Sequence, residues 1–84
     1  MYNIEILSSA HKALKRINRE DRIAIAKAID GLSQNPRPYG YKKLKGSKLY
    51  RIRIGDYRVI YQINNAKLVV LIVRIGHRRE IYRR

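Results

Sequence analysis

The pattern of apolar and polar residues divides the chain into two parts. Residues 2–7 are rich in Ile and alternate loosely, which predicts a first strand. From there to about residue 33, apolar side chains recur at helical spacing instead. The β pattern returns from Leu49 onward. The predicted order is therefore one strand, two helices and then a run of strands.

Two amphipathic helices are predicted in the first part. Their apolar stripes are formed by Ala10, Ala13, Leu14 and Ile17, and by Ile25, Ala28, Ile29 and Leu32. We expect Ser8 or Ser9 to cap the first helix and Asn18 to end it. Glu20 and Asp21 favour a second helix start, because acidic side chains are stabilising in a first turn. Together these segments predict an antiparallel helical hairpin.

The second part of the chain is typical of a meander of strands. Asn35-Pro36-Arg37-Pro38 ends the second helix, and Leu44-Lys45-Gly46 is either a short edge strand or a bend. The main strands are expected over residues 49–54, 57–63 and 67–75, joined by turns at Gly55-Asp56 and Asn64-Asn65. We therefore predict one α+β domain over residues 1–84, with the helices packed on one face of a three- to four-stranded, mostly antiparallel sheet.

The turn at Gly55-Asp56 predicts which side chains share a face of the sheet. With a two-residue loop, Arg53 lies opposite Arg58. Residues two apart also share a face, so Arg51 joins this pair. Directly opposed like charges destabilise a strand pair, but a phosphate bound between the guanidinium groups would explain the cluster. The alternative is a solvated face that happens to be basic.

Composition narrows the partners that such a face can have. Twenty Lys and Arg against six Asp and Glu give a net charge of +14, which favours a polyanionic partner, nucleic acid first. The chain has no Cys, so neither a disulfide nor a thiolate metal site is possible. Its N-terminus lacks the pattern of a signal peptide, and no apolar run is long enough to span a bilayer. We expect a cytoplasmic protein with no membrane partner.

The C-terminal segment carries further chemistry. Residues 76–84 add His77, Tyr82 and four more Arg. Whether His77 or Tyr82 reaches the arginines stays open, because a one-residue slip at the Asn64-Asn65 turn would move every later side chain to the other face. The sequence shows no P-loop, no paired carboxylates and no metal-ligand spacing. An enzyme built from Arg, Lys, His and Tyr would handle an anion, and phosphodiester cleavage is the simplest case.

Four motifs in order resemble the RelE branch of the RelE/ParE toxin superfamily. They are Leu44-Lys45-Gly46, Tyr50-Arg51-Ile52-Arg53, Asp56-Tyr57-Arg58-Val59-Ile60-Tyr61, and Ile75-Gly76-His77-Arg78-Arg79-Glu80-Ile81-Tyr82. The resemblance implies the toxin of a type II toxin–antitoxin system, a ribosome-dependent endoribonuclease that cleaves mRNA in the A site. The 2′-hydroxyl of the RNA would attack the adjacent phosphate without a metal or cofactor. The implied partners are the ribosome, mRNA and a cognate antitoxin in a hetero-oligomeric complex.

The resemblance also implies site residues. The catalytic positions carry onto Arg51, Arg53, Arg58, Arg78 and Tyr82, with His77 as a candidate general acid or base. RNA-binding positions are expected at Lys43, Lys45, Arg51, Arg53, Arg74 and Arg79. Some RelE-type toxins carry Lys where this chain has Arg51 and Arg53, and Arg cannot act as the base. Two alternatives remain, a ParE-like poison of DNA gyrase and a basic RNA-binding module without catalysis.

Overall fold

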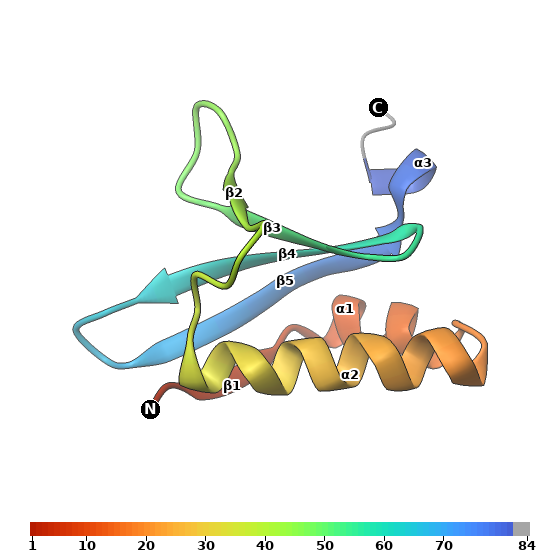
Figure 1. The fold of residues 1–84 in the computed structure, drawn as a ribbon, viewed down its shortest axis with the longest axis horizontal. Coiled ribbons are helices and arrows are strands. Elements are labelled where there is room, and N and C mark those ends of the chain that lie inside the picture. The colour runs from red at the N-terminus through yellow and green to blue at the C-terminus, as the bar shows by residue number, and fades with distance from the viewer. Residues whose placement is uncertain (82–84) are drawn as a thin grey trace.

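The computed structural model describes the backbone of residues 1–81 and the side chains of residues 1–79. The elements are β1 (Asn3–Ile6), α1 (Ser8–Lys15), α2 (Arg19–Gln34), β2 (Lys42–Lys43), β3 (Tyr50–Ile54), β4 (Tyr57–Asn64), β5 (Val69–His77) and α3 (Arg78–Ile81). The five strands form one sheet in the order β1-β5-β4-β3-β2 (Figure 1). The predicted α+β architecture is confirmed.

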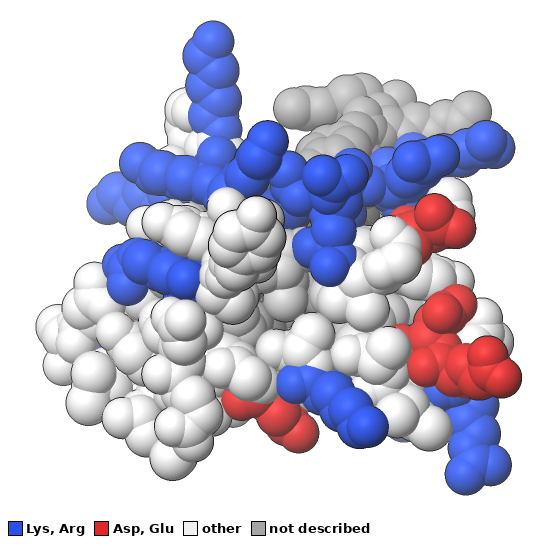
Figure 2. All heavy atoms as spheres, in the orientation of Figure 1, with Lys and Arg blue, Asp and Glu red and all other residues white. Residues whose placement is uncertain are grey.

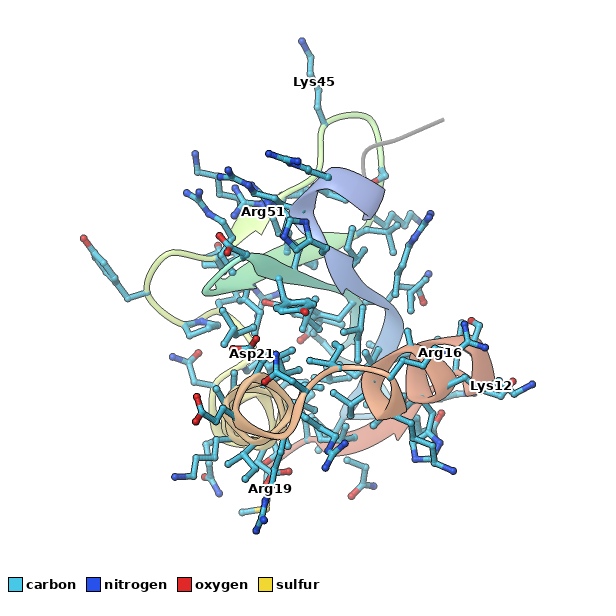
Figure 3. The ribbon with its side chains drawn as sticks, turned by 90° about the vertical axis from the view of Figure 1, so that its right-hand side faces the viewer. Lys12, Arg16, Arg19, Asp21, Lys45 and Arg51 are labelled. Carbon is cyan, nitrogen blue, oxygen red and sulfur yellow. The ribbon has the colours of Figure 1, made fainter. Side chains whose placement is uncertain are left out.

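The helices and the loop after β2 are divided between the two sides of the sheet. Helices α1 and α2 lie beneath it, whereas α3 and the loop after β2 rise above it (Figure 1). The two helices cross steeply and do not form the antiparallel hairpin that the sequence predicts, since Figure 3 shows α2 end-on while α1 runs across the view. The N-terminal strand β1 pairs in parallel with β5, and the other pairings are antiparallel. The short edge strand is Lys42–Lys43, while residues 44–46 form a turn with Gly46 at φ +74°. No helix in the described part of the chain is long and apolar enough to cross a membrane.

The two helix starts differ from each other in how they are capped. Neither Ser8 nor Ser9 is the N-cap of α1, so that prediction is wrong: the cap position is Leu7, and it makes no side-chain cap bond. The Leu7 N–H still donates to the Ile72 carbonyl at 3.0 Å, so the chain passes directly from strand to helix. Asn18 instead caps α2, where its Oδ1 accepts from the Asp21 N–H at 3.0 Å.

The hydrophobic core lies between the helices and the lower face of the sheet. From α2 it takes Ile25, Ile29 and Leu32, as the apolar stripe predicts. The sheet contributes Ile52, Val59, Tyr61, Val70, Ile72 and Ile75. One face of β3 and β4 is thus committed to the helices, and this fixes which side chains point the other way.

A buried tyrosine ties the loop after α2 to the sheet. Tyr61 is fully buried, and its hydroxyl donates to the Pro36 carbonyl at 2.7 Å. Its ring lies 5.9 Å from that of Tyr50, which in turn lies 5.9 Å from that of Tyr41. Burial raises the pKa of Tyr61 to about 12, from an ordinary value of 10. The hydroxyl therefore stays protonated and keeps donating well into the alkaline range.

The substitution Tyr61→Phe tests this bond. It leaves the buried Pro36 carbonyl without its donor, so we expect the free energy of unfolding to fall by about 1–3 kcal/mol. In the wild type, the free energy of unfolding that this bond contributes below pH 10 should decline as the pH rises toward 12. The reason is that Tyr61 loses its proton at a lower pH in the unfolded state than in the folded state. Denaturant unfolding across this range measures both effects. An alkaline decline of equal size in the variant would contradict the assignment.

The matched control for this test is Tyr2→Phe. The Tyr2 hydroxyl donates to Asn65 Oδ1 at 2.7 Å, but at an exposed site where water can replace the lost bond. We therefore expect the control to cost less than about 1 kcal/mol.

Candidate nucleic-acid interface

The strand register arranges basic side chains in two rows on the face of the sheet away from α1 and α2. One row runs across the strands over Lys42, Arg51, Ile60 and Arg74, and the other over Arg53, Arg58 and Gly76. We call the basic members of these rows, Lys42, Arg51, Arg53, Arg58 and Arg74, the arginine face. The predicted pairing of Arg53 with Arg58, and the shared face with Arg51, are confirmed.

The arginine face contains a buried charge. Arg53 and Arg74 are exposed and Arg58 is half-buried, but Arg51 is only 7% exposed. Its Nη1 atom has no hydrogen-bond partner among the described residues. A buried guanidinium group with an unmet donor is costly, and neighbouring cations raise that cost. An anion bound beside Arg51 would remove both penalties.

The charge distribution over the molecular surface follows the same face. Figure 2 shows Lys and Arg in a band across the upper side of the molecule, with most of the visible Asp and Glu below it. Arg51 lies on the side of the sheet away from the helices, among other nitrogen-tipped side chains (Figure 3). None of the described residues that make up the two rows is acidic. The field over this face is therefore strongly positive and suited to a polyanion.

Two of the predicted RNA-binding residues, Lys43 and Lys45, are not part of the arginine face. Lys43 is paired with Tyr50, whose ring packs toward the core, so it lies on the opposite side of β2 from Lys42. Lys42 is the residue beside Arg51, and the sequence does not predict it because a strand of two residues shows no periodicity. Lys45 is exposed at the tip of the loop after β2 (Figure 3).

The C-terminal candidates lie around α3. Arg78 and Arg79 are exposed in this short helix, which packs against β5 and β4. The Arg78 N–H donates to the Asp56 carbonyl at 2.8 Å, which anchors the start of α3 to the turn between β3 and β4. Tyr82 lies outside the described residues.

His77 is not on the arginine face. It pairs across the strands with Tyr57, which packs toward the core, and the two rings meet edge to face at 5.6 Å. The His77 Nδ1 accepts from the Arg79 N–H at 3.3 Å. This side chain therefore supports the first turn of α3, and the sheet separates it from the paired arginines.

Comparison with known proteins identifies the class to which this arrangement belongs. A family model described as the ParE toxin of the type II toxin–antitoxin system parDE matches residues 4–82. The toxin RelG of Mycobacterium tuberculosis is 30% identical over 87 residues, covering 99% of this chain and 98% of the relative. The chain belongs to the ParE toxin family of type II toxin–antitoxin systems, within the RelE/ParE superfamily.

Solved structures place the fold on the RelE side of this superfamily. RelE in the archaeal RelE–RelB complex of Pyrococcus horikoshii is similar with a TM-score of 0.82 at 32% identity, covering 92% of this chain and 94% of that one. The isolated E. coli RelE toxin gives 0.81 at 25% identity, covering 92% and 84%. The resemblance inferred from the four sequence motifs is confirmed.

The buried Arg51 predicts an unusual stability effect. We expect Arg51→Met, which keeps the length of the side chain and removes its charge, to raise the free energy of unfolding by about 1–3 kcal/mol. Arg16→Met is the matched control; its side chain is exposed at the end of α1, away from the arginine face, so its effect should stay within about 0.5 kcal/mol. Denaturant unfolding at low salt measures both. A strongly destabilised Arg51→Met variant would show that the charge is already compensated in the free protein.

The role of His77 in holding α3 is open to a separate test. His77→Asn offers an acceptor oxygen near the position of Nδ1, whereas His77→Ala offers none. We expect the Arg79 amide to exchange with solvent about 2- to 30-fold faster in the Ala variant, as loss of a cap costs about 0.5–2 kcal/mol. The Asn variant should lie close to the wild type.

His11→Ala is the control for this measurement, because His11 is exposed on α1. Equal protection of the Arg79 amide in the wild type and in His77→Ala would rule out the supporting role.

Proposed function

We propose that the protein is a toxin that cleaves mRNA in the ribosomal A site without a metal ion. The observation that carries this proposal is the opposition of Arg53 and Arg58 on two paired strands, with the buried Arg51 beside them. Such a cluster is unfavourable in the free protein and becomes favourable when a phosphodiester lies among the guanidinium groups. Membership of the toxin family and the likeness to RelE structures support it.

The reaction follows from the chemistry of RNA and needs no outside nucleophile. The 2′-oxygen forms a bond to the adjacent phosphorus while the bond from phosphorus to the 5′-oxygen breaks. The products are a 2′,3′-cyclic phosphate and a free 5′-hydroxyl. Negative charge builds on the phosphoryl oxygens in the transition state, where Arg51, Arg53 and Arg58 would stabilise it. Arg78 would act from α3, which the Asp56 carbonyl holds close to the same end of the sheet.

Proton transfer needs groups other than arginine. A proton must leave the 2′-hydroxyl and another must reach the 5′-oxygen, but a guanidinium group stays charged and cannot act as the base. Of the two titratable candidates, His77 is committed through Nδ1 to the Arg79 amide. We assign it to positioning Arg78, and we keep Tyr82 as the candidate that orients the 2′-hydroxyl or stacks on a base.

A protein partner is part of the proposal. RelE of Pyrococcus horikoshii was crystallised as a complex with RelB, and RelE of E. coli with its own RelB. We propose that this chain likewise pairs with an antitoxin in a hetero-oligomeric complex. An acidic segment of the partner would cover the arginine face and relieve its repulsion until the antitoxin is removed.

Loss of one guanidinium group tests the catalytic role directly. We expect Arg58→Ala to slow mRNA cleavage on purified ribosomes by about 100- to 1,000-fold, the usual cost of removing one donor to transition-state charge. Arg16→Ala is the matched control, since Arg16 is exposed at the end of α1, beneath the sheet. His77→Asn should retain more activity than His77→Ala if His77 positions α3, whereas a general acid or base would lose activity in both.

The matching family model is described as a ParE toxin, so poisoning of DNA gyrase is the second candidate function. The same purified protein can test it. A ParE-like gyrase poison would trap cleaved DNA with purified gyrase and leave translation in a cell-free extract intact. Uncut mRNA on ribosomes together with gyrase-dependent DNA breaks would overturn the proposed function. A toxin in which Arg58→Ala cuts mRNA as fast as the wild type would overturn the site.

A further inference from the structure

Tyr39 is an aromatic side chain held in full contact with solvent. Its exposed fraction is 106%, the highest among the exposed large hydrophobic side chains in the described part of the chain. It sits at the corner of a turn closed by the Tyr41 N–H, which donates to the Pro38 carbonyl at 3.0 Å. Gly40 has φ +86°, as the third position of a type II turn requires. This backbone turns the Tyr39 ring outward.

The segment that precedes Tyr39 is held against the sheet and by its own hydrogen bonds. The Pro36 carbonyl accepts from the buried Tyr61 hydroxyl at 2.7 Å. The Arg37 N–H donates to Asn35 Oδ1 at 3.1 Å, and the Arg37 guanidinium lies 5.8 Å from the centre of the Tyr50 ring. The exposed ring is thus presented by an ordered segment, so a ligand that stacks on it would meet little ordering cost.

A groove of about 470 Å³ lies beside this ring, between α2 and β3. It is lined by Ala28, Gly31 and Asn35, by Pro38, Tyr39 and Gly40, and by Ile52, Arg53 and Ile54. The groove is open because β2 pairs only with Tyr50 and Arg51, which leaves the edge of β3 uncovered beyond that point. A Cβ atom added at Gly31 would meet nothing within 4 Å.

The groove is continuous with the arginine face through Arg53. This residue belongs to the row that pairs with Arg58, and it also lines the groove. None of the described residues that line the groove is acidic. An aromatic ring, apolar walls and a cation next to a phosphate-binding row match a nucleotide of single-stranded RNA, whose base stacks on aromatic faces while its phosphate pairs with Arg.

We propose that Tyr39 is a stacking platform for an RNA base next to the phosphate bound on the arginine face. This inference rests on the proposed function and adds to it a base subsite at the edge of β3. Stacking is tolerant of sequence, because every base has a π face. The subsite would therefore add affinity and hold the RNA in register without selecting a codon.

The absence of Trp from the chain makes a direct optical test possible. Tyr39→Trp introduces the sole indole, whose fluorescence falls when a base stacks on it. We expect a short oligoadenylate to quench this fluorescence, and an abasic oligoribonucleotide of the same length to bind with little quenching. Quenching of equal size by both would show that phosphates alone cause the change, and would overturn the inference.

Affinity gives the second readout. We expect Tyr39→Ala to weaken oligoadenylate binding about 5- to 150-fold, the usual range for one stacked base, with an unchanged dependence on salt. Tyr39→Phe should bind as the wild type does. Ile23→Ala, at an exposed position on α2, is the control for loss of surface apolar area. Gly31→Leu, which fills the groove, should weaken binding as well.

The outcomes separate this inference from the proposed function. If the wild type cuts mRNA on ribosomes but Tyr39→Ala binds oligoadenylate as tightly as the wild type, the base subsite is wrong and the nuclease assignment stands. If the purified antitoxin alone buries the introduced indole and oligoadenylate has no effect on it, the groove serves the protein partner and the inference fails. Quenching by bases without any mRNA cleavage would uphold the subsite and reject the nuclease.

Discussion

Burial of one face of β3 and β4 under the helices forces two guanidinium groups to oppose each other across the strand pair, and the proposed site depends on this constraint. Arg53 and Arg58 face each other, and Arg51 lies buried on the same side. Their repulsion is overcome by the other face of the same strands, where Val59 and Tyr61 are fully buried under the helices. A slip of one residue would bury the arginines in the core, so the hydrophobic pattern holds the charges in place.

The same arrangement explains why the domain is so basic. A small core leaves most of the chain at the surface, and the face of the sheet away from α1 and α2 can contact a partner. In the proposed function, Arg51 trades stability for anion binding, because its Nη1 atom has no hydrogen-bond partner among the described residues. Around this face, α3 and the loop carrying Lys45 rise on the same side of the sheet (Figure 1).

Much of the fold and part of the site could be predicted because they depend on local rules. The two-residue turn at Gly55-Asp56 set the pairing of Arg53 with Arg58, and apolar periodicity located both helices. The face of His77 could not be predicted, because a bulge between Ile60 and Tyr61 shifts the register of β5 by one residue. A bulge changes backbone geometry without a clear mark in the residues that form it.

The central claim is that the arginine face neutralises RNA phosphates. The most direct measurement is the salt dependence of binding to a single-stranded oligoribonucleotide, for the wild type and for the combined Arg51, Arg53 and Arg58 substitutions to Met. Each neutralised phosphate contributes about −0.7 to the slope of log K against log salt concentration. The three side chains surround one phosphate, so their loss should make the slope shallower by about 0.7. An unchanged slope in the triple variant would contradict the claim.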